Sequence, residues 1–204
     1  LFKKPCKIFI LDNFIDKKKK ILLKKKSFDF KVHDVSKKIN LNQKFDYIIN
    51  AAGIPTPSQY KVRPIETLDV SYLGTRFLLD VAKKMKAKFI FFSSSEIYGN
   101  PDKKNIPTKE DYRGYVSSIG GRSCYDEGKR VGETLSYTYY ERFGIHTNCI
   151  RPFNVYGPGM LRTDYRVLPN FALNILMKKP LRVFYPGTQT RTYCYATDAI
   201  IGFF

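Results

Sequence analysis

One short apolar run, Lys88–Ser93 (KFIFFS), constrains the fold of this 204-residue chain most strongly. The run predicts a strand, and it lies between two segments that are predicted to be helices. Pro64–Lys86 comes before it and repeats apolar residues at helical spacing, and Tyr125–Phe143 comes after it. Strands that alternate with helices form parallel sheets with crossover helices. The sequence therefore predicts an α/β protein.

Further segments extend this pattern along the chain. We predict additional strands at Lys7–Leu11, Phe28–Val32, Phe45–Ala52, His146–Pro152 and Leu181–Tyr185, and another amphipathic helix at Arg166–Lys179. The polar segment Asn100–Gly121 is predicted to be a long loop, and loops of that length are usually functional or mobile. The segment Phe153–Gly159 (FNVYGPG) interrupts the pattern with Asn, Pro and two Gly. No internal repeat is present.

The composition, with 43% hydrophobic and 26% charged residues, is that of a globular protein. No apolar run approaches the roughly 20 residues that cross a bilayer, so we expect no membrane span. The first residues, LFKKPCKIFI, lack the apolar stretch and cleavage site of a signal peptide. A cytoplasmic location is the resulting expectation.

The formal net charge of +18 raises the question of nucleic-acid binding. The excess comes from lysine, much of it in Lys17–Lys26, without the interleaved aromatic residues of a base-stacking surface. A compositional bias of the source, or attraction of small anionic ligands, explains the charge better. We therefore expect no nucleic-acid partner.

The cysteines and histidines do not form a metal-binding pattern. No CxxC spacing occurs among Cys6, Cys124, Cys149 and Cys194, and the two histidines, His33 and His146, are far apart. We predict no metal site, and we expect the cysteines to be reduced and buried.

The candidate catalytic residues lie in two segments that follow the strand predicted at Lys88–Ser93. The segment RSCYDEGKR places Tyr125 and Lys129 four residues apart, and therefore on one face of a helix. A phenol with a pKa near 10 is a poor base at neutral pH, and an adjacent ammonium stabilises its phenolate. If Ser95 and Glu96 of FFSSSEIYG face that pair, one site holds a base, a hydroxyl donor and a carboxylate.

Other candidate ligand contacts lie at predicted strand ends. Asp12 ends the first strand, where an acidic residue of a dinucleotide-binding fold can bind ribose hydroxyls. Asp34 could similarly contact adenine. For both, a turn formed by Asp is the alternative. Gly53 begins a Gly-Pro loop that would let a cofactor approach the backbone, although an ordinary loop explains it equally well.

Together, SSSEIYG, YDEGK, RPFNVYGPG and GTQTRTYCYATDA resemble the extended short-chain dehydrogenases/reductases of the NAD-dependent epimerase/dehydratase family. Within this group, SSSE followed by SCYDEGKR is most similar to the UDP-glucuronate decarboxylases, or UDP-xylose synthases. The resemblance implies a Rossmann-like doubly wound parallel sheet that lacks its first βα unit, with part of a small C-terminal substrate-binding lobe. Residues 1–153 would form the partial NAD-binding domain, and residues 154–204 the partial nucleotide-sugar-binding lobe.

The resemblance also assigns roles to residues. It implies catalytic roles for Tyr125, Lys129, Ser94, Ser95, Glu96 and Arg191, with Ser94 standing where the decarboxylases usually have Thr. It implies NAD binding by Asp12, Asn13, Phe14, Asp34, Val35, Ala51, Ala52, Gly53 and Ser93, together with Tyr125 and Lys129. Asn154, Tyr60, Arg166 and Arg191 would bind the nucleotide-sugar.

Four departures from the family pattern are visible. The glycine-rich loop after the first strand is absent, and the chain ends shortly after Asp198, so we expect a fragment of a longer protein. The decarboxylases have a Leu-Ala-Ser-Pro type segment where this chain has AAGIPTP, and they commonly have Asn where Ser71 stands.

The resemblance implies an NAD-dependent lyase that converts UDP-glucuronate to UDP-xylose through a 4-keto intermediate. A nucleotide-sugar 4-epimerase or 4,6-dehydratase is the alternative, and Glu96 is the residue that discriminates, because epimerases usually lack an acid there. An inactive fragment or a basic nucleic-acid-binding protein is a second alternative. Related enzymes are homodimers, here through Pro64–Lys86 and Tyr125–Phe143.

Overall fold

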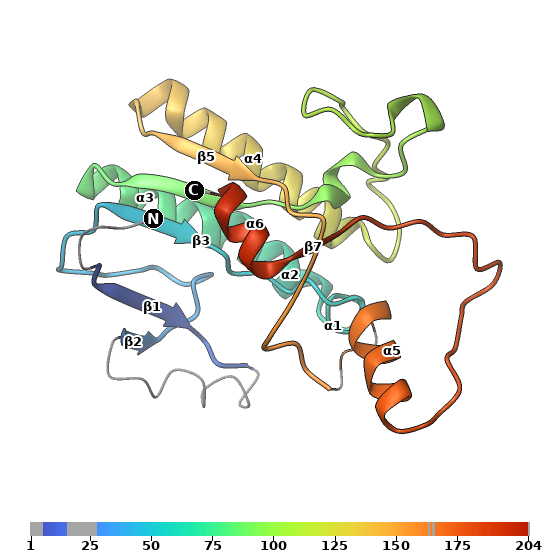
Figure 1. Cartoon of the computed structure of the whole chain (residues 1–204). Helices are drawn as coiled ribbons and strands as arrows, with labels where there is room; N and C mark the ends of the chain where they lie inside the picture. Colours follow the sequence, from blue (N-terminus) through green and yellow to red (C-terminus); the bar gives the residue numbers. More distant parts are fainter. Residues whose placement is uncertain (1–5, 16–27, 163, 165, 204) are drawn as a thin grey trace. The chain divides into compact units, whose positions relative to one another are not determined.

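The structure is a computed structural model that describes residues 6–15, 28–162, 164 and 166–203. It contains two compact units, Leu1–Arg151 and Pro152–Phe204 (Figure 1). The functions expected for residues 1–153 and 154–204 stay predictions. The lysine-rich segment Lys17–Lys26 lies outside the described residues.

The first unit contains two parallel ladders. β1 (Ile8–Asp12) pairs with β2 (Phe28–Val32), and β3 (Tyr47–Asn50), β4 (Lys88–Phe92) and β5 (Thr147–Ile150) form a second ladder in that order. The strands of both ladders point in the same direction in Figure 1. The predicted parallel α/β architecture is therefore confirmed, and β4, which constrained it in the sequence, is the central strand of its ladder.

The helix predicted from Pro64 to Lys86 forms, but it contains a π-helical turn. It consists of α2 (Pro64–Asp69), the π-turn η2 (Val70–Gly74) and α3 (Thr75–Met85), and a short helix, α1 (Pro57–Tyr60), precedes it. Pro64 occupies the first turn, where its missing N–H removes no intrahelical bond. π-Turns often mark functional sites in helices, and this one packs against the next helix, α4.

α4 (Ser123–Phe143) covers the same face of the second ladder as α3. Gly144 caps its C-terminal end with a φ of 65°, the left-handed conformation that glycine adopts without strain. The core between the helices and the sheet includes Val35, Ile48, Leu78, Leu79, Val81, Ala82, Ala87, Phe89, Phe91, Tyr139 and Ile145. Phe91 is only 1% exposed, and a Cβ added to Gly132 of α4 would lie 2.2 Å from its Cζ. The glycine therefore lets α4 approach β4 closely.

The second unit differs most from expectation. The strand predicted at Leu181–Tyr185 is wrong: this segment has no regular structure, and Tyr185 is 97% exposed. Instead β6 (Asn154–Tyr156), within the segment expected to interrupt the pattern, pairs in parallel with β7 (Tyr193–Tyr195). A two-stranded ladder forms here from residues whose local sequence carries turn signals. The helices of this unit are α5 (Val167–Leu176) and α6 (Ala196–Phe203).

The segment between β4 and α4 is largely irregular, as predicted for Asn100–Gly121. It begins with the 3₁₀ turn η3 (Ser95–Tyr98) and contains a second one, η4 (Lys103–Asn105). An isolated bridge joins Gly99 to Tyr115, so part of the segment is tied back onto η3.

Two further expectations concern the burial of the cysteines and the absence of a membrane span. Cys6 and Cys149 are exposed, so the prediction that all four cysteines are buried is wrong. Cys149 lies on the terminal strand β5 of its ladder, which leaves it less covered than the central strand. The described helices include none long and apolar enough to cross a membrane.

Candidate active site

The site begins where β4 ends, as ligand sites of open α/β sheets do at the carboxyl ends of strands. Ser93 and Ser94 follow the strand and are 3% and 7% exposed. Ser94 caps the turn η3, because its hydroxyl accepts a hydrogen bond from the backbone N–H of Glu96 at 3.2 Å. The SSSE sequence therefore folds as a capped turn that leaves the Glu96 side chain half-exposed.

Tyr125 and Lys129 lie one turn apart near the start of α4, and both are buried. The Lys129 ammonium lies 5.9 Å from the centroid of the Tyr125 ring and donates a 2.6 Å hydrogen bond to the carbonyl of Phe92. Lys129 thus joins the first turns of α4 to the last residue of β4. The four-residue spacing was sufficient to predict that the two side chains share a face.

The protonation behaviour of this pair differs from the expectation that the ammonium lowers the pKa of the phenol. Burial raises the pKa of Tyr125, while a hydrogen bond from the Ser94 hydroxyl and the nearby Arg122 act in the opposite direction. Burial also lowers the pKa of Lys129 to about 8. These shifts arise from the folded structure, because both groups are removed from water. The ammonium donates its hydrogen bond to the Phe92 carbonyl.

Tyr60, from α1, supports the phenol from the other side. The two rings are stacked, with centroids 5.5 Å apart and planes at 15°, and Tyr60 is 1% exposed. In this arrangement Tyr60 packs behind Tyr125. Its expected contact with the substrate stays a prediction.

Sequence reasoning missed the cation beside this site. The Arg122 guanidinium forms an ion pair with Glu96, and its Nε lies 3.4 Å from Oδ2 of Asp126. Oδ1 of Asp126 is buried and has no hydrogen-bond partner among the described residues, and burial raises the pKa of this carboxyl. The four-residue spacing of Arg122 and Asp126 was a usable signal, whereas the link to Glu96 depends on the fold.

The acidic residues expected to bind the cofactor both form local turns. Oδ1 of Asp12 accepts the backbone N–H of Phe14 at 2.6 Å, and Oδ1 of Asp34 accepts that of Ser36 at 2.9 Å. The turn-forming alternative is therefore observed, and the second oxygen of each carboxylate can still accept hydrogen bonds. Their roles in cofactor binding stay predictions.

Asn13, Phe14 and Val35, which follow these two acids in the chain, make contacts within the protein. Asn13 accepts the N–H of Ile15 at 3.2 Å, while Phe14 is buried and packs against Phe30 with ring centroids 5.8 Å apart. Val35 belongs to the core and lies under Gly74, where an added Cβ would meet it at 3.1 Å.

The end of β3 reaches the Tyr–Lys pair. Ala51, Ala52 and Gly53 follow this strand, and a Cβ added to Gly53 would lie 3.5 Å from Nζ of Lys129. The structure therefore brings the exits of β3 and β4 and the start of α4 to one place. Ser93 adds a buried hydroxyl oxygen there that has no hydrogen-bond partner in the part of the chain that the structure describes.

The remaining candidates belong to the second unit. Nδ2 of Asn154 donates to the carbonyl of Thr192 at 3.0 Å, and Nη1 of Arg191 donates to the carbonyl of Thr190 at 2.6 Å. Arg166 pairs with Asp164, with Nε 2.9 Å from Oδ2. Their predicted roles toward substrate stay predictions.

The buried lysine has a consequence for stability. Because its folded pKa of about 8 lies below the ordinary 10.5, the folded state binds this proton less tightly. Burial of the charged ammonium therefore costs the folded state free energy. This cost is complete below pH 8 and disappears as the pH rises to 10.5. We expect Lys129→Met to raise the free energy of unfolding at pH 7 by about 1–3 kcal/mol, with a gain that shrinks toward pH 10.

Urea unfolding at pH 7 and pH 10 measures this difference. Lys84→Met, which removes an exposed lysine from α3, is the matched control and should show no such pH dependence. Equal stability of Lys129→Met and the wild type at pH 7 would contradict a buried ammonium.

The chain was compared with known proteins. The model of the NAD dependent epimerase/dehydratase family matches residues 1–204. UDP-glucuronic acid decarboxylase 1 of Arabidopsis thaliana is 39% identical over 198 residues, which are 96% of this chain and 45% of that protein. UDP-glucuronic acid decarboxylase 1 of Xenopus tropicalis is 36% identical, with 96% and 46% covered. The chain thus spans about half the length of these relatives.

Solved structures show the same fold. Epimerase Mth375 from Methanothermobacter thermautotrophicus superposes with a TM-score of 0.84 at 23% identity, covering 97% of this chain and 59% of that one. UDP-glucuronic acid 4-epimerase from Bacillus cereus, in complex with UDP-glucuronic acid and NAD, gives 0.78 at 26% identity, with 96% and 63% covered. The predicted Rossmann-like fold is confirmed.

Proposed function

The chain belongs to the NAD-dependent epimerase/dehydratase family, and from this premise we propose that the whole protein decarboxylates UDP-glucuronate to UDP-xylose. The observation that carries the proposal is the turn η3, which holds the Ser95–Glu96 pair beside the buried Tyr125. The identity to UDP-glucuronic acid decarboxylases supports it.

The residues present fit NAD. Gly53 leaves the backbone free beside Nζ of Lys129, and the buried hydroxyl of Ser93 offers an unused hydrogen-bonding group at the same strand ends. We propose that Lys129 and Ser93 bind NAD there, with Asp12 and Asp34 toward its adenosine end. When bound, NAD supplies the hydride acceptor for oxidation of the sugar.

In the proposed reaction Tyr125 acts as the general base on the sugar 4-hydroxyl. Oxidation at C4 places a ketone β to the carboxylate on C5, and such an acid loses carbon dioxide because its electrons flow into an enolate. Protonation of the enolate at C5 and return of the hydride to C4 would then give UDP-xylose with no net oxidation. Ser94 already hydrogen-bonds toward the phenol and, with Ser95, would stabilise charge on the C4 oxygen. We assign Glu96 and Arg191 to the region of C5 and its carboxylate, and Asn154, Tyr60 and Arg166 to binding of the nucleotide-sugar.

A 4-epimerase is the second candidate within the family, since a UDP-glucuronic acid 4-epimerase is among the similar structures. It would share the first oxidation but retain the carboxylate. A 4,6-dehydratase is a weaker candidate, because dehydratases typically have Asp-Glu where Ser95 and Glu96 stand in this chain. Glu96 favours the decarboxylase over the 4-epimerase, and Ser95 favours it over the dehydratase.

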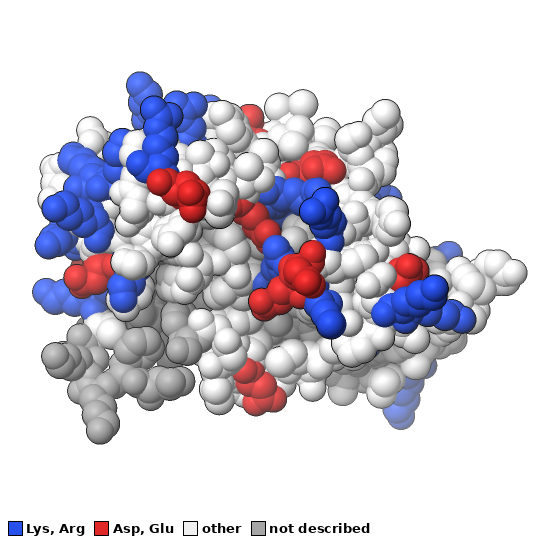
Figure 2. All heavy atoms as spheres, turned by 90° about the horizontal axis from the view of Figure 1, so that it is seen from above, with Lys and Arg blue, Asp and Glu red and all other residues white. Residues whose placement is uncertain are grey.

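Part of the basic charge is explained by residues at the C-terminal ends of helices. Figure 2 shows Lys and Arg side chains gathered on the side where α3 and α4 end. Lys83, Lys84 and Arg142 belong to the last turns of these helices, where cations stabilise the helix dipole. This weakens the case for nucleic acid, and steeply salt-dependent DNA binding would restore it.

Incubation of the whole protein with NAD and UDP-glucuronate tests the proposal. Carbon dioxide together with UDP-xylose is the expected result, and carbon dioxide with accumulating NADH would indicate that the hydride is not returned. UDP-glucuronate recovered as its 4-epimer, or unchanged, would refute the decarboxylase and show that Glu96 does not discriminate.

We further propose a homodimer and a cytoplasmic location. α2, η2 and α4 leave apolar side chains around a shallow hollow, with Leu68 41%, Tyr72 42% and Val131 37% exposed. A second copy of the chain would cover these side chains. The protein is then expected to sediment as a dimer, and Leu68→Asp to give monomers; a wild-type monomer at micromolar concentration would refute this interface.

A further inference from the structure

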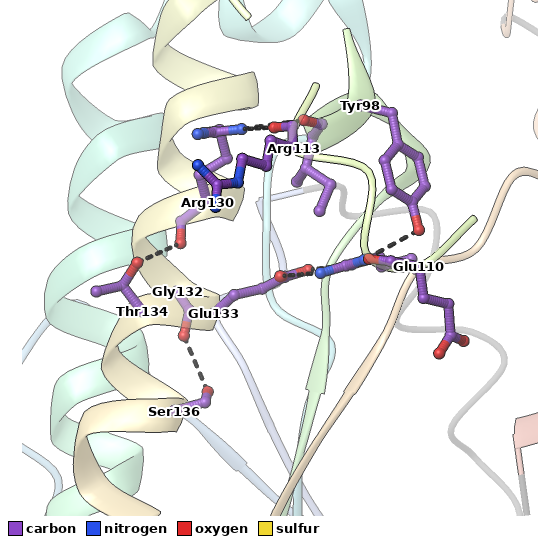
Figure 3. A network of polar contacts seen from close by, with 10 residues as sticks. Tyr98, Glu110, Arg113, Arg130, Gly132, Glu133, Thr134 and Ser136 are labelled. Carbon is purple, nitrogen blue, oxygen red and sulfur yellow. Dashed lines mark hydrogen bonds and ion pairs between the residues drawn. The ribbon is translucent and has the colours of Figure 1, made fainter. Parts of the chain in front are cut away.

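Arg151, the residue after β5, joins three segments of the first unit. Its Nε and Nη2 donate to Oε1 and Oε2 of Glu133 at 2.9 Å and 2.8 Å. Its Nη1 donates to the hydroxyl of Tyr98 at 3.0 Å and to the carbonyl of Glu110 at 2.6 Å. The side chains of Glu133, from α4, and Tyr98, from η3, converge on the same place (Figure 3). A two-pronged Arg–carboxylate pair fixes geometry as well as adding energy.

A second arginine repeats the connection one turn earlier on α4. Nη1 of Arg130 donates to the carbonyls of Ile97 and Arg113 at 3.3 Å and 2.9 Å. Tyr115 donates its backbone N–H to the carbonyl of Tyr98 at 3.2 Å. A Cβ added to Gly99 would lie 1.8 Å from the Tyr115 carbonyl oxygen, so the segment packs directly on η3. Residues 110–115 therefore form a strap across η3 and α4.

These contacts end on the elements that carry the chemistry. Tyr98 is the last residue of η3, which also holds Glu96 and is capped by Ser94. Glu133 follows Lys129 by one turn of α4 and Tyr125 by two, so the three lie on one face of the helix. The position of η3 relative to α4 sets how Ser94 and Glu96 meet Tyr125.

We propose that Arg151 is a positioning residue, which holds η3 and the strap against α4 and thereby aligns Ser94 and Glu96 with Tyr125. The alignment matters to catalysis only through the proposed function, because that function assigns these three side chains their chemical roles. Arg151 itself contacts Glu133 and Tyr98 and acts through them. A shift of about 1 Å in a catalytic group can lower a rate by roughly 100-fold.

Tyr98→Phe is the sharpest variant, because it removes one hydroxyl from the connection and keeps a ring that is 3% exposed. Arg151→Lys keeps the charge but loses the fork that grips Glu133. Tyr140→Phe removes a phenol from the half-exposed side of α4 and is the matched control.

Two measurements decide the proposal. In the chain itself, we expect amide hydrogen exchange at Glu96, Gly99 and Tyr115 to accelerate at least about 10-fold in Tyr98→Phe and Arg151→Lys, with β4 and α3 unchanged. In the whole protein, we expect kcat to fall about 5- to 20-fold with KM changed less than about twofold. Tyr140→Phe should match the wild type in both.

The inference is overturned if Tyr98→Phe and Arg151→Lys behave like Tyr140→Phe, or if exchange accelerates equally throughout the first unit, which would indicate a general loss of stability. The exchange measurement needs no substrate. If the wild type does not act on UDP-glucuronate, the proposed function fails, while local exchange still tests whether Arg151 holds η3 and the strap in place.

Discussion

Tyr125→Phe is expected to lower the kcat of the whole protein on UDP-glucuronate by about 10³-fold, within the range of roughly 10²–10⁴ for loss of a general base. The variant loses one oxygen, and its ring can still stack on Tyr60 at the observed 5.5 Å. The effect should therefore appear in the chemical step, with little change in the midpoint of thermal unfolding.

Steady-state kinetics on both proteins measures this loss, with Tyr137→Phe as a control on the exposed side of α4. A kcat within tenfold of the wild type would remove Tyr125 from the role of base. Because burial raises the pKa of Tyr125, only a small fraction is phenolate at neutral pH. Since this pKa lies above the ordinary value near 10, we expect kcat/KM of the wild type to keep rising with pH from neutral to about 10, and this limb should be absent in Tyr125→Phe.

The elements of the first unit were predictable because their signals are local. The four central residues of KFIFFS are apolar, as a strand buried on both faces requires, and Phe89, Ile90 and Phe91 of β4 are buried. The repeat from Pro64 to Lys86 gave a helix. It did not predict the π-turn at Val70–Gly74, which lies against α4 in the folded chain. Leu181–Tyr185 was predicted as a strand from its apolar residues, but no neighbouring strand pairs with it among the described residues.

The candidate site was predictable only in outline. Tyr125 and Lys129 share a face because of helix periodicity, which the sequence shows directly. The pKa values of the two groups depend on their burial in the folded chain, and the ion pair of Arg122 with Glu96 joins the start of α4 to η3. The strap held by Arg151 likewise joins residues more than 15 positions apart. Such contacts exist only after the chain has folded.

Gly132→Ala is expected to lower the free energy of unfolding by about 2–3 kcal/mol, although alanine is favoured over glycine in helices by about 1 kcal/mol. The added methyl group would lie 2.2 Å from Cζ of Phe91, and this ring is fixed in the core at 1% exposure. Either the ring or α4 must move. Gly202→Ala, in α6 with open space around the glycine, is the matched control and should not destabilise the protein.

A double-mutant cycle with Phe91→Leu identifies the cause. Phe91→Leu alone leaves a cavity and is expected to destabilise the protein, but it also makes room for the methyl group that Gly132→Ala adds. The double variant should therefore be more stable than the sum of the two single effects by at least about 1 kcal/mol in urea unfolding. Additive effects, or a stabilising Gly132→Ala, would mean that α4 does not rest on Phe91. Coupling would show that this glycine sets the distance between β4 and α4, on which the Lys129–Phe92 contact depends.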